Sequence, residues 1–101
     1  MKIAVTSQGN TLDSQIDPRF GRAAYIIVLD TETLEFEAFD NNENKNAFKG
    51  AGIQAAAMIS DKEAQVLLTG FCGPNAFKTL EAAGVKVVND QSGRVIDAVQ
   101  K

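Results

Sequence analysis

The stretch Val66-Leu67-Leu68-Thr69-Gly70-Phe71-Cys72-Gly73-Pro74-Asn75 decides the fold of this chain. Its first four residues form an apolar run that is typical of a strand buried on both faces. Residues 70–73 carry two glycines and predict a tight turn. Pro74 stands where helices favour proline, at the first helical position. The helix that follows has a predicted apolar stripe and a glycine stop, formed by Phe77, Leu80, Ala83 and Gly84.

Upstream of this unit the chain predicts three strands and one helix. The apolar run Ile3-Ala4-Val5 and the aliphatic residues 24–29 indicate two buried strands. Residues 34–39 alternate with the period of a strand that has one wet face, and the turn at 30–33 makes them the second arm of a hairpin. We therefore expect this third strand near a sheet edge. A helix is predicted over residues 51–61, with Ile53, Ala56, Ala57 and Ile59 at helical spacing.

The order of elements predicts the fold class. Residues 85–88 indicate a last strand, and a short helix begins at Ser92-Gly93 and runs through Val99. The order strand-strand-strand-helix-strand-helix-strand-helix predicts an α/β fold, a mixed sheet of five strands with parallel central strands and helices on its faces. The 101 residues suit one domain spanning 1–101, since neither a linker nor a repeat divides them.

Composition excludes several classes of protein. With 45% hydrophobic and 23% charged residues, the chain is neither disordered nor collagen-like. It has no His, which excludes a Ser-His-Asp triad, and one Cys, which excludes an intrachain disulfide and a Cys-based structural zinc site. A net charge of −3 argues against nucleic acid as a partner, and no apolar run is long enough for a membrane span. Because the N-terminus has a strand pattern rather than a signal peptide, we expect a cytoplasmic protein.

Candidate binding loops follow from the predicted sheet. Ligands of open α/β sheets bind beyond the carboxyl ends of the strands, where residues 6–9, 50–54 and 70–75 are expected to meet. The last two loops bring Gly50, Gly52 and Gly73 to helix N-termini, whose free N–H groups attract anions. Neither loop matches a phosphate loop, so the pattern indicates a general anion site. The same glycines could instead serve tight turns alone.

The single thiol, Cys72, lies in one of these loops. A helix N-terminus lowers the pKa of a thiol, so Cys72 could ligate a metal or bind a cluster. The other interpretation is a small buried apolar residue, the common fate of a free cysteine. Spacing alone favours this second interpretation, because one thiolate without His or a second Cys is a poor metal site.

Two arginines precede the second predicted strand. Arg19 and Arg22 surround Phe20-Gly21 and could clamp an anionic ligand. Alternatively they are surface arginines paired with acids, among them Asp13 and Asp17. The polar residues 41–49 are predicted to be mobile, and their Lys45 and Lys49 could close over the same site or be simply solvated.

Taken together, the motifs resemble the dinitrogenase iron-molybdenum cofactor biosynthesis family. The matching segments run along nearly the whole chain: Met1-Lys2-Ile3-Ala4-Val5, Leu12-Asp13-Ser14, Phe20-Gly21-Arg22-Ala23, Asp30-Thr31-Glu32-Thr33, Gly50-Ala51-Gly52-Ile53-Gln54-Ala55-Ala56, Leu68-Thr69-Gly70-Phe71-Cys72-Gly73-Pro74-Asn75-Ala76-Phe77 and Leu80-Glu81-Ala82-Ala83-Gly84-Val85-Lys86-Val87. Each segment alone is weak, but their combination at these separations is specific.

The resemblance implies a ribonuclease H-like fold without ribonuclease activity. It also implies noncovalent binding of an anionic metal–sulfur cluster, such as the iron-molybdenum cofactor, its precursor or a molybdenum–copper sulfide cluster. Many relatives carry one His at the position of Arg19 and a second His at or near the position of Lys49. Imidazole ligation is therefore absent here, and Cys72 becomes the only soft ligand.

We therefore hypothesise a small non-enzymatic binder or carrier of such a cluster, served by cluster donor and acceptor proteins. The predicted contacts are of three kinds. Positive charge comes from Arg19 and Arg22, and a thiolate that binds metal comes from Cys72. Backbone N–H groups come from the two glycine-containing loops, at Gly50, Gly52, Ile53, Gly73 and Asn75. An alternative is a metal-independent interaction or regulatory module that uses strand 34–39 and loop 41–49 to contact an iron–sulfur protein or an ATPase. An enzyme for a phosphorylated substrate is the third reading, disfavoured by the shortage of acid–base groups in these loops.

Overall fold

The computed structural model describes residues 1–41 and 51–100, which hold five strands and three helices. In this part of the chain no helix is long and apolar enough to cross a membrane. The strands are β1 (Lys2–Ser7), β2 (Tyr25–Asp30), β3 (Phe36–Asp40), β4 (Val66–Leu68) and β5 (Lys86–Val88). The helices are α2 (Ala51–Asp61), α3 (Pro74–Ala82) and α4 (Val95–Val99).

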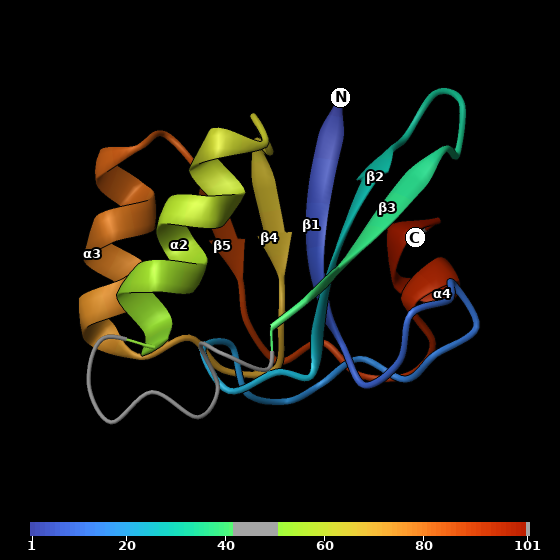
Figure 1. Cartoon of the computed structure of the whole chain (residues 1–101), viewed down its shortest axis with the longest axis horizontal. Coiled ribbons are helices and arrows are strands. Elements are labelled where there is room, and N and C mark those ends of the chain that lie inside the picture. The colour runs from blue at the N-terminus through green and yellow to red at the C-terminus, as the bar shows by residue number, and fades with distance from the viewer. Residues whose placement is uncertain (42–50, 101) are drawn as a thin grey trace.

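The strands form one mixed sheet in the order β3-β2-β1-β4-β5. β2 pairs antiparallel with both β1 and β3, whereas β4 pairs parallel with β1 and with β5. This arrangement confirms the predicted α/β class, the hairpin and the place of β3 at an edge. In Figure 1 the chain starts at one end of the sheet, and the loop between β1 and β2 lies at the other end.

The helices cover the two faces of the sheet unequally. Side chains of α2 and α3 pack with alternate strand residues, among them Ala4, Ile26 and Leu67, on one face. On the opposite face α4 packs with Val5 and the neighbouring strand residues. Figure 1 shows α2 and α3 side by side, with α4 apart from them. Side chains of the buried central strands point alternately to the two faces of the sheet, so they form two separate apolar layers.

The hairpin differs from the prediction at its second arm. The predicted strand begins at residue 34, whereas β3 begins at Phe36. Leu34 adopts a left-handed backbone, with φ of 62°, and donates its N–H to the carbonyl of Asp30 at 2.8 Å. The N–H of Asp30 in turn donates to Glu35, so two residues oppose one, as in a bulge. This bulge shortens the regular strand.

The helices begin close to the predicted positions but bury different residues. α2 has the predicted bounds, yet Ile53 is 48% exposed, and the buried positions are Ala55, Ala56 and Ile59. In α3 the predicted apolar stripe is wrong at two positions, because Phe77 is 36% exposed and Ala83 is also exposed. The buried residues of this helix are Ala76 and Leu80. The reason is that α2 and α3 pack on each other as well as on the sheet, and this rotates small residues inward.

The C-terminal helix is also shorter than predicted. It begins at Val95 rather than near Ser92, because Gly93 takes a left-handed backbone with φ of 90°. The carbonyl of Gly93 accepts the N–H of Ile16 at 2.8 Å, so these residues serve the loop after β1 instead of the helix.

Candidate functional site

Two loops meet at the carboxyl end of the sheet, where the adjacent parallel strands β1 and β4 both end. The N–H of Phe20 donates to the carbonyl of Phe71 at 3.1 Å, and Arg19 and Phe71 form a parallel bridge. Gly70 lies so close to Pro18 that a Cβ there would come within 2.5 Å of the Pro18 Cα. The loop that carries Arg19 is thus held against the turn that carries Cys72.

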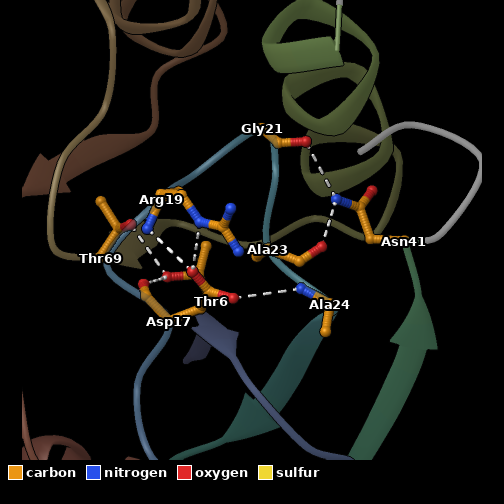
Figure 2. Close-up of polar contacts among 8 residues, drawn as sticks. All are labelled: Thr6, Asp17, Arg19, Gly21, Ala23, Ala24, Asn41 and Thr69. Carbon is orange, nitrogen blue, oxygen red and sulfur yellow. Dashed lines mark hydrogen bonds and ion pairs between the residues drawn. The ribbon is translucent and has the colours of Figure 1, made fainter. Parts of the chain in front are cut away.

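A buried carboxylate, that of Asp17, organises the first of these loops (Figure 2). Its Oδ1 accepts the backbone N–H of Arg19 at 3.0 Å and the Nε of Arg19 at 3.4 Å, and its Oδ2 accepts the N–H of Ala24 at 3.3 Å. The hydroxyl of Thr6 donates to the Asp17 carbonyl at 2.7 Å and also bonds to Thr69 at 2.9 Å. The Asp17 network therefore joins both strand ends to the loop before β2.

Asn41 closes the other side of this loop. Its side-chain amide donates to the carbonyls of Gly21 and Ala23, at 3.2 and 2.9 Å, as Figure 2 shows. Its backbone N–H donates to Ala24 at 3.0 Å. The segment with Arg22 is therefore anchored at both ends, by Asp17 and by Asn41.

We expect Asp17→Asn to lower the free energy of unfolding by about 1.5 kcal/mol, because one carboxylate oxygen becomes an amide that cannot accept an N–H. Urea denaturation measures the change. Asp13→Asn is the matched control, since the Asp13 side chain is 81% exposed and its contact, at 3.2 Å, is with the exposed Arg94. Exposed ion pairs contribute little, so we expect no measurable change in the control. Equal losses in the two variants would contradict the anchoring role of Asp17.

Cys72 is buried, with 5% of its surface exposed, in the apolar layer under α2 and α3. Its thiol lies 3.7 Å from the carbonyl of Gly73, and its backbone N–H donates to Asn89 at 2.9 Å. Burial raises the pKa of the Cys72 thiol above its ordinary value. Burial therefore favours the neutral thiol, and the interpretation of Cys72 as a small buried residue is confirmed.

The N-terminus of α3 follows directly after Cys72 in the chain. Gly73 is the N-cap residue, no side chain caps this helix, and Pro74 follows at the first position. A Cβ at Gly73 would meet no atom of the described residues within 4 Å. Asn75 is exposed in the first turn. First-turn N–H groups of a helix attract anions, so this end of α3 is a place for negative charge.

The start of α2 lies against the same part of α3. A Cβ at Gly52 would come 3.1 Å from the Cβ of Ala76, which explains why a residue without a side chain stands there. Ile53 is exposed on the next position. The predicted site residue Gly50, together with Lys45 and Lys49, lies outside the described residues.

The arginines occupy different surroundings. The side chain of Arg19 is 65% exposed while its Nε contacts Asp17, so the predicted ion pair exists and the guanidinium still faces solvent. Arg22 is exposed in the turn before β2. The structure thus pairs the backbone of Arg19 with Phe71, next to Cys72 and Gly73 in the chain, and places Gly52 against Ala76 in the first turn of α3.

Sequence reasoning missed the residues that hold these loops, Asp17, Asn41, Asn89 and the Thr6–Thr69 pair. Thr6, Asn41, Thr69 and Asn89 are polar residues in or directly after strands, and this is the signal that could have found them, whereas Asp17 has no such signal. Among the described residues no three His, Cys, Asp or Glu side chains converge as a metal site would require.

Comparisons with known proteins show the family of this chain. A family model described as dinitrogenase iron-molybdenum cofactor matches residues 1–101. The chain belongs to this family. No curated protein matches it. The membership confirms the family predicted from the motifs.

Similar proteins of known structure share the fold. The chain is 48% identical to the orange protein of Desulfovibrio gigas, solved in its apo form, with a TM-score of 0.95 over 98% of this chain and 83% of that one. It is 35% identical to a putative NifB protein from Thermotoga, with a TM-score of 0.84 over 98% of this chain and 84% of that one. These likenesses confirm the mixed five-stranded α/β fold.

Proposed function

We propose that this protein is a non-enzymatic binder or carrier of an anionic metal–sulfur cluster, which it holds at the carboxyl end of its sheet. Family membership supports a ligand of this class, because the family is described by the iron-molybdenum cofactor. The observation that carries the proposal is the backbone contact of Phe20 with Phe71, at 3.1 Å, which holds the loop with the exposed Arg19 side chain against the turn that leads into α3. Positive charge and N–H donors there suit a negative ligand.

In this proposal the cluster is bound noncovalently. A bond from Cys72 to metal would require the buried thiol to lose its proton, and burial opposes that loss. Arg19 supplies charge, and the N–H groups near Gly73 and Asn75 supply donors. Arg22, Gly50, Gly52 and Ile53 are proposed to form the rest of the surface around the ligand. Donor and acceptor proteins for the cluster follow from a carrier role.

The test is an anaerobic titration of the reduced protein with tetrathiomolybdate, with and without Cu(I), and with an iron–molybdenum–sulfur cluster. Visible charge-transfer bands report uptake, and gel filtration shows whether metal and sulfide stay bound. We expect saturable uptake. A folded protein that takes up none of these clusters would contradict the proposal and favour the metal-independent interaction module.

We expect Arg19→Gln to weaken uptake about three- to fivefold at low ionic strength, because one positive charge is lost beside the ligand. The difference should shrink towards zero near about 0.5 M salt, where exposed charges are screened. The measurement is the same titration at several salt concentrations. Arg94→Gln is the control, since Arg94 pairs with Asp97 and Asp13 outside the site. Equal effects of both substitutions would remove Arg19 from the site.

Cys72→Ser provides the second arm of this experiment, because it keeps the size of the side chain while removing the sulfur. We expect saturable uptake to persist. Loss of uptake in a variant with wild-type thermal stability would instead assign a bond between the Cys72 thiolate and metal, and would replace the noncovalent proposal.

A further inference from the structure

The outer edge of β3 offers unpaired backbone groups. β3 ends the sheet, and no described strand pairs with its outer side. At its end the N–H of Asn41 donates to Ala24 across the ladder, at 3.0 Å. Because backbone groups alternate in an antiparallel ladder, the odd-numbered residues of β3 face β2. The N–H and C=O groups of Phe36 and Ala38 therefore point away from the sheet, where another strand could pair with them.

Beside this edge lie two adjoining hollows of about 240 and 150 Å³, on the face of the sheet next to the end of α2. They share Lys2, Val28 and Glu37. Their lining holds five carboxylates against two lysines: Asp30, Glu35, Glu37, Asp61 and Glu63 against Lys2 and Lys62. The Lys62 ammonium is already engaged, 4.7 Å above the ring of Phe39. The positive N-terminus also acts on Asp30, but the five carboxylates still outnumber the positive groups, so the hollows carry a net negative charge.

The residues around the bulge add apolar surface to the same edge. Phe36 is 41% exposed and Leu34 is 42% exposed. Ala38, which faces the α4 side of the sheet, is only partly buried. An added strand would thus meet acids with one of its faces and apolar side chains with the other.

We propose that the β3 edge binds an extended, basic segment of a partner protein, which adds to the sheet as a further strand. Its alternate Lys or Arg side chains lie in the acidic hollows, and the residues between them are apolar and pack on Phe36 and Ala38. A second copy of this chain is a poorer occupant. Pairing of β3 with itself would bring two acidic surfaces together, and such like-charge contacts are destabilising.

This surface is separate from the candidate cluster site. Lys2, which lines both hollows, starts β1, whereas the cluster site lies beyond the other end of that strand. In Figure 1 the turn between β2 and β3 lies at the same end of the molecule as the N-terminus. A partner at the β3 edge leaves the carboxyl end of the sheet open, so the inference stands whether or not a cluster binds there.

The test uses an acetylated and amidated octapeptide of alternating lysine and valine, added to the full-length protein and followed by NMR. We expect the largest amide shifts at Phe36 and Ala38. The glutamate–valine counterpart should bind at least tenfold more weakly. Two further peptides carry methyl groups on the backbone nitrogens of either the lysines or the valines. In a paired strand only one of these two sets of N–H groups faces β3, so the methylated peptides test backbone pairing without any change in the charge of the peptide. One methylated peptide should lose binding and the other keep it.

Two protein variants complete the test. Glu37→Gln combined with Glu63→Gln should weaken the lysine–valine peptide about fivefold. Ala38→Pro should remove binding, because the lost N–H points outward, and Ala38→Thr is its control. Equal binding of both methylated peptides, or shifts away from β3, would overturn the proposal. A protein dimer that Ala38→Pro dissociates would also overturn it and assign the edge to a second copy.

Discussion

Replacing Gly70 with alanine is expected to lower the free energy of unfolding by about 3 kcal/mol. A Cβ at this position would lie 2.5 Å from the Cα of Pro18 and 2.7 Å from its carbonyl oxygen. Both atoms belong to the backbone, so no side-chain rotation relieves the clash. The loop or the turn has to move, and the 3.1 Å hydrogen bond from Phe20 to Phe71 is the first contact at risk.

Urea denaturation of Gly70→Ala measures this loss. Gly73→Ala is the matched control, because it adds the same methyl group three residues later, where no described residue has an atom within 4 Å of the new Cβ. We expect the control to lose less than about 1 kcal/mol, which is the cost of a poorer N-cap residue. If Gly70→Ala is no more destabilising than Gly73→Ala, the close approach of Pro18 does not govern the joining of the two loops.

The buried strands and α2 could be predicted from the sequence because burial leaves a direct mark on composition. Ile26, Ile27 and Leu67 are fully buried, and runs of such residues indicate strands wherever they occur. β3 could be predicted only in part. The alternation of residues 34–39 is genuine, but Leu34 adopts a left-handed backbone that sequence patterns assign to glycine or asparagine. The start of β3 therefore depended on a bulge with no sequence signature.

The candidate site could be predicted from the sequence only in part. The glycines and Cys72 could be placed near helix N-termini, since turn residues between a strand and a helix are local signals. The burial of Cys72 agrees with the interpretation that spacing favoured, but the exposure of Phe77 depends on how α2 and α3 pack together, and this is a tertiary property. Asp17 acts on Ala24, seven residues later in the chain, so its role appears only when the loop closes.

The second large effect is expected for a change of charge at Gly73. Gly73→Asp should weaken cluster uptake at least about tenfold relative to Gly73→Asn, because an added carboxylate in front of α3 repels an anionic ligand. The two side chains have nearly the same size, so steric obstruction is common to both. Gly73 has φ of −65° and ψ of 162°, an extended backbone that suits an N-cap residue. Asp and Asn are both favoured there, so both variants should keep or raise the wild-type melting temperature.

This pair separates the ligand site from the fold more cleanly than removal of Arg19 does. Substitutions that remove a contact often destabilise a protein, and lost uptake then has two explanations. Here the aspartate stabilises the helix through its dipole while it opposes the ligand, so stability and binding should change in opposite directions. Thermal denaturation and the tetrathiomolybdate titration, made on the same samples, provide the two measurements. Equal uptake by Gly73→Asp and Gly73→Asn would show that the ligand does not lie at the N-terminus of α3.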